Sequence, residues 1–134
     1  MTPLDRLKDM LSYDKIQSSN LEVFKTDKSC ELGEPPLAAL FPENDQDIQA
    51  ILKWANTHKV PVIPRAGATG KAGGCTSTKD AVVLCLDRFD SIIKKDSENR
   101  ILSVQAGVKT QAVKTAATEM GLYYPPDPGS LETC

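Results

Sequence analysis

The fold of this chain is encoded most clearly in residues 55–74, which read ANTHKVPVIPRAGATGKAGG. The β-branched run 60–64 predicts a short strand near a sheet edge or end, because Pro61 and Pro64 cannot donate ladder hydrogen bonds. The loop that follows holds four of the eight glycines, a density that requires a backbone explanation. Its N–H groups could converge on an anion, and Arg65 places a positive charge at the entrance. The pattern predicts a phosphate cradle, with a ligand-free flexible loop as the alternative.

Helical and strand patterns flank this loop on both sides. Apolar spacing predicts helices over 3–12 and 45–58, the second capped by Asn44, and a last helix capped by Thr110 and stopped by Gly121. We expect further strands over 37–41, 81–86 and 101–106, the 81–86 strand fully buried and the 101–106 strand buried and alternating at its end. Residues 20–36 are interpreted as a connecting segment and 94–100 as a solvated turn. The order of elements indicates an α+β fold, a small sheet with flanking helices.

Two familiar phosphate motifs do not fit the loop. A P-loop would need glycine at Arg65 and a hydroxyl residue at Ala72, so its magnesium ligand is missing. A dinucleotide-binding βαβ turn would explain Asp87 as a ribose ligand, but residues 75–80 are too few for the crossover helix. We therefore interpret Asp87 and Asp90 as turn residues.

Composition and charge exclude several classes of function. The 134 residues are 40% hydrophobic and 25% charged, as in one soluble globular domain. A net charge of −2 argues against nucleic acid as a partner, and no apolar run approaches the ~20 residues of a transmembrane helix. The four cysteines show no metal or disulfide spacing, and the single histidine, His58, is expected at a helix C-terminus rather than in catalysis. We expect reduced thiols, no metal site and a cytoplasmic location.

Two separated motifs carry a resemblance to a known family. The strand and loop of residues 55–74, followed by Pro-Pro-Asp-Pro-Gly-Ser at 125–130, resemble the FAD-binding domain of the vanillyl-alcohol oxidase and p-cresol methylhydroxylase superfamily. Within it, the chain is similar to the branch that includes glycolate oxidase and D-lactate dehydrogenase. The match runs from Leu37 to Cys134, so we expect residues 1–36 to be an N-terminal helix and connecting segment and 37–134 the first part of a PCMH-type FAD-binding domain. The turn-rich end predicts that the chain stops within this domain at Cys134.

The resemblance also implies which residues bind FAD. One set would wrap the pyrophosphate and pass beneath the cofactor: Arg65, Ala66, Gly67, Ala68, Thr69, Gly70, Gly73 and Gly74. A second set would line the other side of the flavin: Pro126, Asp127, Pro128 and Ser130. Family members usually carry glycine at the positions of Ala66 and Ala68, and an alanine that must adopt positive φ costs on the order of 1 kcal/mol. We expect the flavin to be non-covalent, because Thr69 stands where relatives that tether the cofactor commonly have histidine.

The resemblance implies an FAD-dependent oxidoreductase that oxidises a small 2-hydroxy acid, of the glycolate or D-lactate type, to the 2-oxo acid. The catalytic residues of such an enzyme would lie beyond Ser130, so none is assigned here, and the piece alone is expected to be inactive. Another oxidoreductase of the superfamily, acting on an aryl alcohol, a sugar lactone or an amino-sugar nucleotide, remains an alternative. So does a non-enzymatic nucleotide-binding or interaction module that has lost flavin. A homo-oligomer or an electron-accepting partner subunit is compatible with the resemblance.

Overall fold

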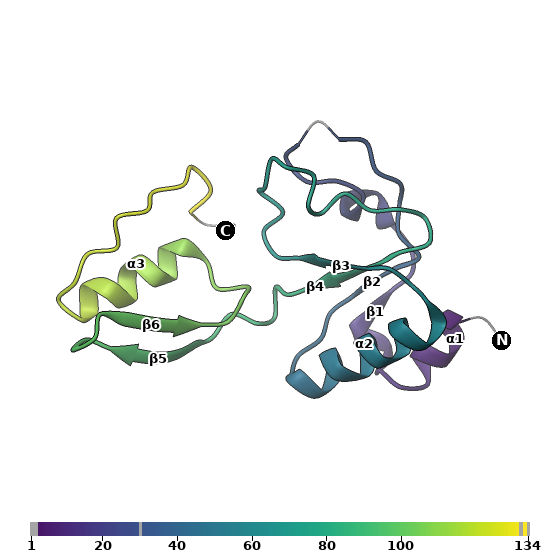
Figure 1. Ribbon diagram of the computed structural model, residues 1–134, viewed down its shortest axis with the longest axis horizontal. Coiled ribbons are helices and arrows are strands. Elements are labelled where there is room, and N and C mark those ends of the chain that lie inside the picture. The colour runs from purple at the N-terminus through teal and green to yellow at the C-terminus, as the bar shows by residue number, and fades with distance from the viewer. Residues whose placement is uncertain (1–2, 30, 132, 134) are drawn as a thin grey trace.

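The computed structural model describes residues 3–29, 31–131 and 133. Its first lobe is a four-stranded sheet in the order β1-β2-β4-β3, with β2, β4 and β3 parallel and β1 antiparallel to β2 (Figure 1). The strands are β1 (Ile16–Gln17), β2 (Ala38–Leu40), β3 (Val62–Arg65) and β4 (Val82–Cys85). The helices of this lobe are α1 (Pro3–Lys8) and α2 (Asp45–His58), with 3₁₀ turns η1 (Tyr13–Lys15) and η2 (Leu21–Phe24). β3 lies at the sheet edge, as predicted from Pro61, which precedes it, and Pro64 within it.

The second lobe is a hairpin covered by one helix. β5 (Ile92–Asp96) pairs antiparallel with β6 (Ile101–Val104), and α3 (Thr110–Glu119) lies over them (Figure 1). Lys95 and Glu119 form an ion pair of 2.6 Å between the hairpin and the helix. The predicted mixed α+β architecture, a small sheet with flanking helices, is therefore what the chain adopts.

Side chains alternate between the two faces of the first sheet and build a core on each. One core packs beneath α1 and α2 and contains Leu7, Leu11, Ile16, Ala38, Leu40, Ile51, Trp54, Ala55, Val82 and Leu84. The other contains Ala39, Val83 and Cys85, against which Leu21, Phe24, Phe41 and Ile63 pack. In Figure 1 the helices α1 and α2 lie on one side of the sheet and the turn η2 on the other. Residues before β2 thus cover both faces.

Helix α2 forms where the sequence predicts it, from Asp45 to His58. The Asn44 side chain accepts a hydrogen bond from the Asp47 backbone N–H, which satisfies one of the free donors of the first turn. Trp54 is 3% exposed, and its Nε1 donates to the Pro3 carbonyl over 2.8 Å, so it joins α2 to α1.

Several sequence-based expectations were wrong in detail. The first helix ends at Lys8 rather than residue 12, and Lys109, not Thr110, is the N-cap of α3. Residues 94–96 belong to β5, so the polar turn is shorter than predicted. The strand β6 is not buried, because its sheet has only two strands and one helix to cover it. The connecting segment 20–36 contains η2, and β1 was not predicted.

Candidate functional site

The glycine-rich loop joins two neighbouring parallel strands without a helix. It leaves β3 at Arg65 and enters β4 at Val82, and residues 66–81 are turns and irregular structure. A βαβ nucleotide-binding turn needs a helix in this place. The structure therefore excludes the dinucleotide-binding motif, as the short spacing predicts.

The loop presents backbone donors that the described part of the chain leaves unused. Within the described residues, no hydrogen-bond acceptor is recorded for the backbone N–H groups from Ala66 to Gly74. Ala68 has φ +51° and Gly73 has φ +78°, so the backbone of the loop enters the left-handed region at two separate points. The Thr76 hydroxyl is buried and likewise has no partner among the described residues. Unpaired N–H groups on a curved backbone are suited to binding an anion.

The guanidinium of Arg65 lies against the N-terminal segment. Its Nη1 donates to the Thr26 carbonyl over 2.8 Å and its Nη2 to the Val23 carbonyl over 3.1 Å. The Phe24 ring lies 5.7 Å from the guanidinium carbon, within the range of a cation–π contact. Arg65 therefore joins the start of the loop to η2, and its predicted contact with pyrophosphate stays a prediction.

A cavity of about 410 Å³ lies where the start of the loop meets the second lobe. Its lining residues are Ala66, Gly67, Asp87, Asp90, Gly107, Lys109, Ala112 and Thr133. A second cavity of about 350 Å³ shares Ala66, Gly67, Gly107 and Thr133 and extends to Val113 and Tyr124. The first residues of the predicted phosphate loop thus face the connection between β6 and α3.

The C-terminal motif lies beside these cavities. Asp127, Pro128 and Ser130 line a hollow of about 440 Å³ together with Thr133, which also lines both cavities above. Figure 1 shows this C-terminal segment running back from α3 toward the glycine loop. Asp127 also forms an ion pair with Lys114 of α3. Two motifs that lie far apart in the sequence are therefore adjacent in the fold.

Not all predicted site residues share these cavities. Ala68, Thr69, Gly70, Gly73 and Gly74 lie further along the loop and line none of the cavities described above. A Cβ atom built on Gly74 meets nothing within 4 Å, and one on Gly70 meets only Asp27 Oδ2 at 3.9 Å. Pro126 is exposed. This part of the loop is open on one side, which leaves space for a bound group.

Sequence reasoning missed the wall opposite the loop. Gly107, Lys109 and Thr133 line the cavity but were not predicted, while Asp87 and Asp90 were interpreted only as turn residues. A signal for Gly107 was present, since a glycine between a strand and a helix indicates a close backbone approach. A Cβ atom there would lie 2.1 Å from the Leu86 carbonyl oxygen, so glycine is required.

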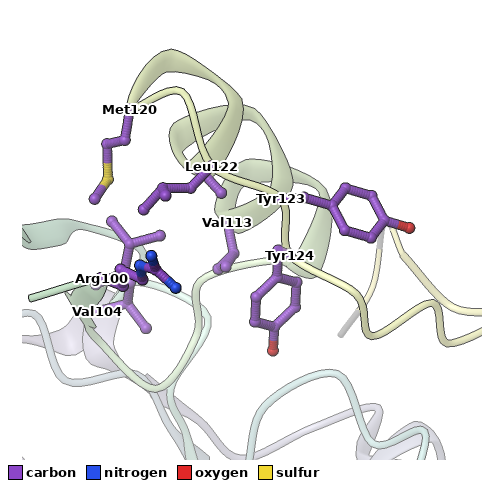
Figure 2. Close-up of a pocket in the computed structure, with 9 residues that line it drawn as sticks. Arg100, Val104, Val113, Met120, Leu122, Tyr123 and Tyr124 are labelled. Carbon is purple, nitrogen blue, oxygen red and sulfur yellow. The ribbon is translucent and has the colours of Figure 1, made fainter. Parts of the chain in front are cut away.

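An apolar groove of about 420 Å³ lies on the second lobe, between β6, α3 and the segment that follows α3. Figure 2 shows Met120, Leu122 and Val113 of its wall facing Val104, while the Tyr123 ring points away. Tyr123 is 81% exposed, and Tyr124 lines both this groove and the smaller cavity beside the loop. The tyrosine pair therefore lies at the rim of this groove.

Histidine and cysteine side chains show no catalytic arrangement. His58 Nδ1 lies 2.8 Å from the Trp54 carbonyl within α2, which places its ring in the helix end and not in a cavity. Burial raises the pKa of Cys75, an effect that Arg65 partly offsets, and burial also raises the pKa of Cys85 to about 12. Cys75 and Cys85 are free thiols, while Cys30 and Cys134 lie outside the described residues. Within residues 3–29, 31–131 and 133, no cluster of His, Cys, Asp or Glu could hold a metal, and no helix could span a bilayer.

The fold and the loop together define an α+β domain in which a glycine-rich loop joins two neighbouring parallel strands without a crossover helix. The chain belongs to the FAD binding domain family, which matches residues 36–134. It is 35% identical over 120 residues to a D-2-hydroxyglutarate dehydrogenase of Xanthomonas citri pv. viticola, covering 90% of this chain and 25% of that protein. It is 34% identical over 121 residues to glycolate oxidase subunit GlcD of Bacillus subtilis, covering 90% of this chain and 26% of that protein.

Solved structures confirm the fold. The structure of p-cresol methylhydroxylase superposes with a TM-score of 0.74 at 21% identity, over 90% of this chain and 24% of that chain. The predicted superfamily and the predicted cofactor, FAD, are thereby confirmed. The chain spans about a quarter of the length of the curated relatives it matches.

Proposed function

We propose that residues 66–74 bind the pyrophosphate of FAD without a covalent link. The observation that carries this proposal is the run of backbone N–H groups from Ala66 to Gly74 that have no acceptor among the described residues, beside a cavity that the C-terminal motif also borders. Oriented N–H groups stabilise phosphate oxygens without any rearrangement of side chains. Lys109 lines the same cavity opposite the loop, but so do the carboxylates of Asp87 and Asp90, so the backbone N–H groups and not the net charge of the wall would hold the phosphate oxygens. The residues present therefore fit a diphosphate group.

We further propose that the whole protein oxidises a 2-hydroxy acid to the 2-oxo acid. Bound FAD supplies an acceptor for the hydride that leaves the substrate α-carbon. The two relatives described above are named for D-2-hydroxyglutarate and for glycolate, and both compounds are 2-hydroxy acids. The described residues contribute binding and orientation of the cofactor, and no catalytic base is assigned among them. Oxidation of an aryl alcohol, a sugar lactone or an amino-sugar nucleotide is the alternative within the superfamily.

A flavin-free interaction module is the second candidate function. The feature that favours it is Ala68, whose φ of +51° places a Cβ atom where glycine would leave the backbone free to approach phosphate. We also propose that the FAD-binding domain begins at residue 37 and that the protein is cytoplasmic. A homo-oligomer or an electron-accepting partner subunit is a further proposal.

Titration of flavins into the full-length protein tests the binding proposal. We expect FAD to bind with saturable quenching of its fluorescence and riboflavin, which lacks phosphate, to bind far more weakly. Equal binding of riboflavin would refute the pyrophosphate loop, and no binding of either would favour the interaction module. The isolated 134-residue chain is expected to bind FAD weakly, because the flavin ring and adenine need further walls.

Reduction of the bound flavin tests the proposed chemistry. Under anaerobic conditions, glycolate, D-lactate or D-2-hydroxyglutarate should bleach the yellow flavin absorbance of the holoprotein. The matched controls are pyruvate and 2-oxoglutarate, the 2-oxo acids of D-lactate and D-2-hydroxyglutarate, whose carbonyl carbon carries no hydrogen to donate as hydride. Bleaching by an aryl alcohol or a sugar lactone instead would establish the alternative substrate class.

A further inference from the structure

The glycine loop has little internal support of its own. Among the described residues of 66–81, the backbone hydrogen bonds within the loop are those from Thr76 to Gly73, 3.0 Å, and from Ala81 to Thr78, 3.1 Å. A long loop without secondary structure is uncommon in a compact domain, because its chain entropy must be offset by other contacts. The order of this loop must therefore come from elsewhere in the chain.

Residues 23–29 and 31–34, which we call the brace, contact the loop at its entrance, its middle and its exit. At the entrance, Arg65 donates to the carbonyls of Val23 and Thr26. In the middle, the Lys28 N–H donates to the Gly70 carbonyl over 3.1 Å. At the exit, the Ser77 N–H donates to the Lys25 carbonyl over 3.0 Å, and the Glu34 N–H donates to the Ser77 carbonyl over 2.9 Å.

Asp27 lies at the centre of the brace. It is 9% exposed, and its Oδ1 accepts from the Ser29 N–H over 2.8 Å while its Oδ2 accepts from the Cys75 N–H over 3.2 Å. Hydrogen bonds from the Ser29 side chain and backbone lower the pKa of Asp27, with a smaller effect of the Cys75 N–H in the same direction. The group is therefore a carboxylate at neutral pH, and hydrogen bonds to a charged acceptor are stronger than those to a neutral one. One buried charge thus joins the brace to the far end of the loop.

The brace also fits the loop closely at Gly33. A Cβ atom on Gly33 would lie 1.9 Å from the Lys25 carbonyl oxygen and 2.9 Å from the Ser77 carbonyl oxygen. Backbone atoms cannot move away from such a contact without breaking the Lys25 to Ser77 hydrogen bond. This part of the brace is therefore packed directly against the loop exit.

We propose that the brace positions the cofactor loop, and that Asp27 is a positioning residue for FAD which holds the loop N–H groups in their anion-binding arrangement. The inference rests on the proposed binding of pyrophosphate by residues 66–74. It assigns a role in cofactor binding to residues before position 36, where the family match begins. Loss of the Asp27 carboxylate releases the Cys75 N–H and lets the loop sample other conformations, so FAD affinity falls while the chemistry of bound flavin is unchanged.

The test compares three variants of the full-length protein: Asp27→Ala, Asp27→Asn and the control Asp80→Asn. Asp80 is an exposed carboxylate at the end of the same loop, and its Oδ1 accepts a hydrogen bond from the Thr78 hydroxyl over 2.7 Å. We expect Asp27→Ala to raise the Kd for FAD at least tenfold and Asp27→Asn to raise it less, because an amide oxygen can serve only one of the two N–H donors. The control Asp80→Asn should bind FAD and turn over like the unaltered protein.

Hydrogen exchange without FAD separates positioning from general destabilisation. In Asp27→Ala, amides of residues 66–77 should exchange at least tenfold faster, while amides of α2 keep their rates. Unchanged FAD affinity, or faster exchange that extends equally to α2, would overturn the inference. Asp27→Asn keeps the side-chain shape and allows the same measurement if the alanine variant does not fold. If the unaltered protein binds no FAD, the proposed function fails, and the exchange data alone still decide whether Asp27 orders the loop.

Discussion

The backbone N–H of Gly107 donates to the carbonyl of Phe89 over 2.7 Å, and this bond joins the β6–α3 connection to the turn after β4. Gly107 also lines the cavity that faces the glycine loop. The absence of a side chain at this position therefore sets the separation of the two lobes as well as the shape of the cavity.

Gly107→Ala should destabilise the protein by about 1–3 kcal/mol, because its Cβ would lie 2.1 Å from one backbone oxygen and 2.9 Å from another. The measurement is the urea midpoint of unfolding at constant m-value. Gly129→Ala is the matched control, since a Cβ atom at Gly129 meets nothing within 4 Å. Equal midpoints for the two variants would show that the lobes can separate without cost.

Ala68→Gly should stabilise the folded protein, by on the order of 1 kcal/mol, because Ala68 occupies the left-handed region at φ +51°. Ala72→Gly is the control, since Ala72 lies in the same loop and is not among the residues with positive φ. There the extra flexibility of glycine should give no gain. The measurement is the free energy of unfolding of both variants. A loss of stability in Ala68→Gly would contradict the predicted strain at Ala68.

The ion pair between Lys15 and Asp47 should make stability depend on pH in acid. Burial alone would raise the pKa of Asp47, but hydrogen bonds from Lys15 and from the backbone of Glu43, together with the Lys15 charge, lower it below its usual range. A carboxyl whose folded pKa is depressed stabilises the fold above its unfolded pKa, about 4, and loses this contribution as pH falls through the folded value.

Asp47→Asn should therefore show a smaller loss of unfolding free energy between about pH 5 and pH 2 than the unaltered protein. Asp45→Asn, in the same first turn of α2, is the control for a change in helix-end charge. A pH profile in which both variants fall as steeply as the unaltered protein would contradict the assignment.

The flavin should be released when the full-length holoprotein is precipitated with acid. Thr69 has no nucleophilic nitrogen, and burial raises the pKa of Cys75, whose thiol donates to the Pro64 carbonyl over 3.5 Å. A thiol is a poor nucleophile compared with its thiolate. Yellow colour in the supernatant is the expected result, whereas colour that stays with the washed pellet would demonstrate a covalent link.

Local signals explain why some elements could be predicted to the residue. The bounds of α2 follow from the Asn44 cap, the acidic first turn and an apolar stripe, all within one stretch of chain. The strand β4 was predicted over 81–86 and spans Val82–Cys85, because one continuous apolar run marks its position but not its exact ends. These features act over a few residues and need no knowledge of the tertiary structure.

The missed elements depend on partners far along the chain. β5 contains Ile92 and Ile93 followed by three polar residues, and a register shift between Ile92 and Lys94 breaks the alternation that would reveal a strand. β1 is two residues long and exists because Ile16 and Gln17 pair with β2. Neither has a local pattern strong enough to predict it.

The residues of the candidate site likewise fall into those that the sequence predicts and those that only tertiary structure brings to the site. The glycines and the C-terminal motif were visible in the sequence, whereas the direction of the Arg65 side chain depends on carbonyls at Val23 and Thr26, some 40 residues earlier. Gly107, Lys109 and Thr133 meet the loop only through packing of the two lobes. Contacts of this kind follow from tertiary structure and are not encoded in spacing.

The turn η2 covers a sheet face that a crossover helix would cover in a βαβ unit. Leu21 and Phe24 pack on Ala39, Val83 and Cys85, and they precede the residues that match the family. A chain trimmed to start at residue 36 would leave this strip of the sheet bare to solvent. Exposed apolar patches of this kind promote self-association, so such a trimmed protein should aggregate even though every residue of its glycine loop is intact.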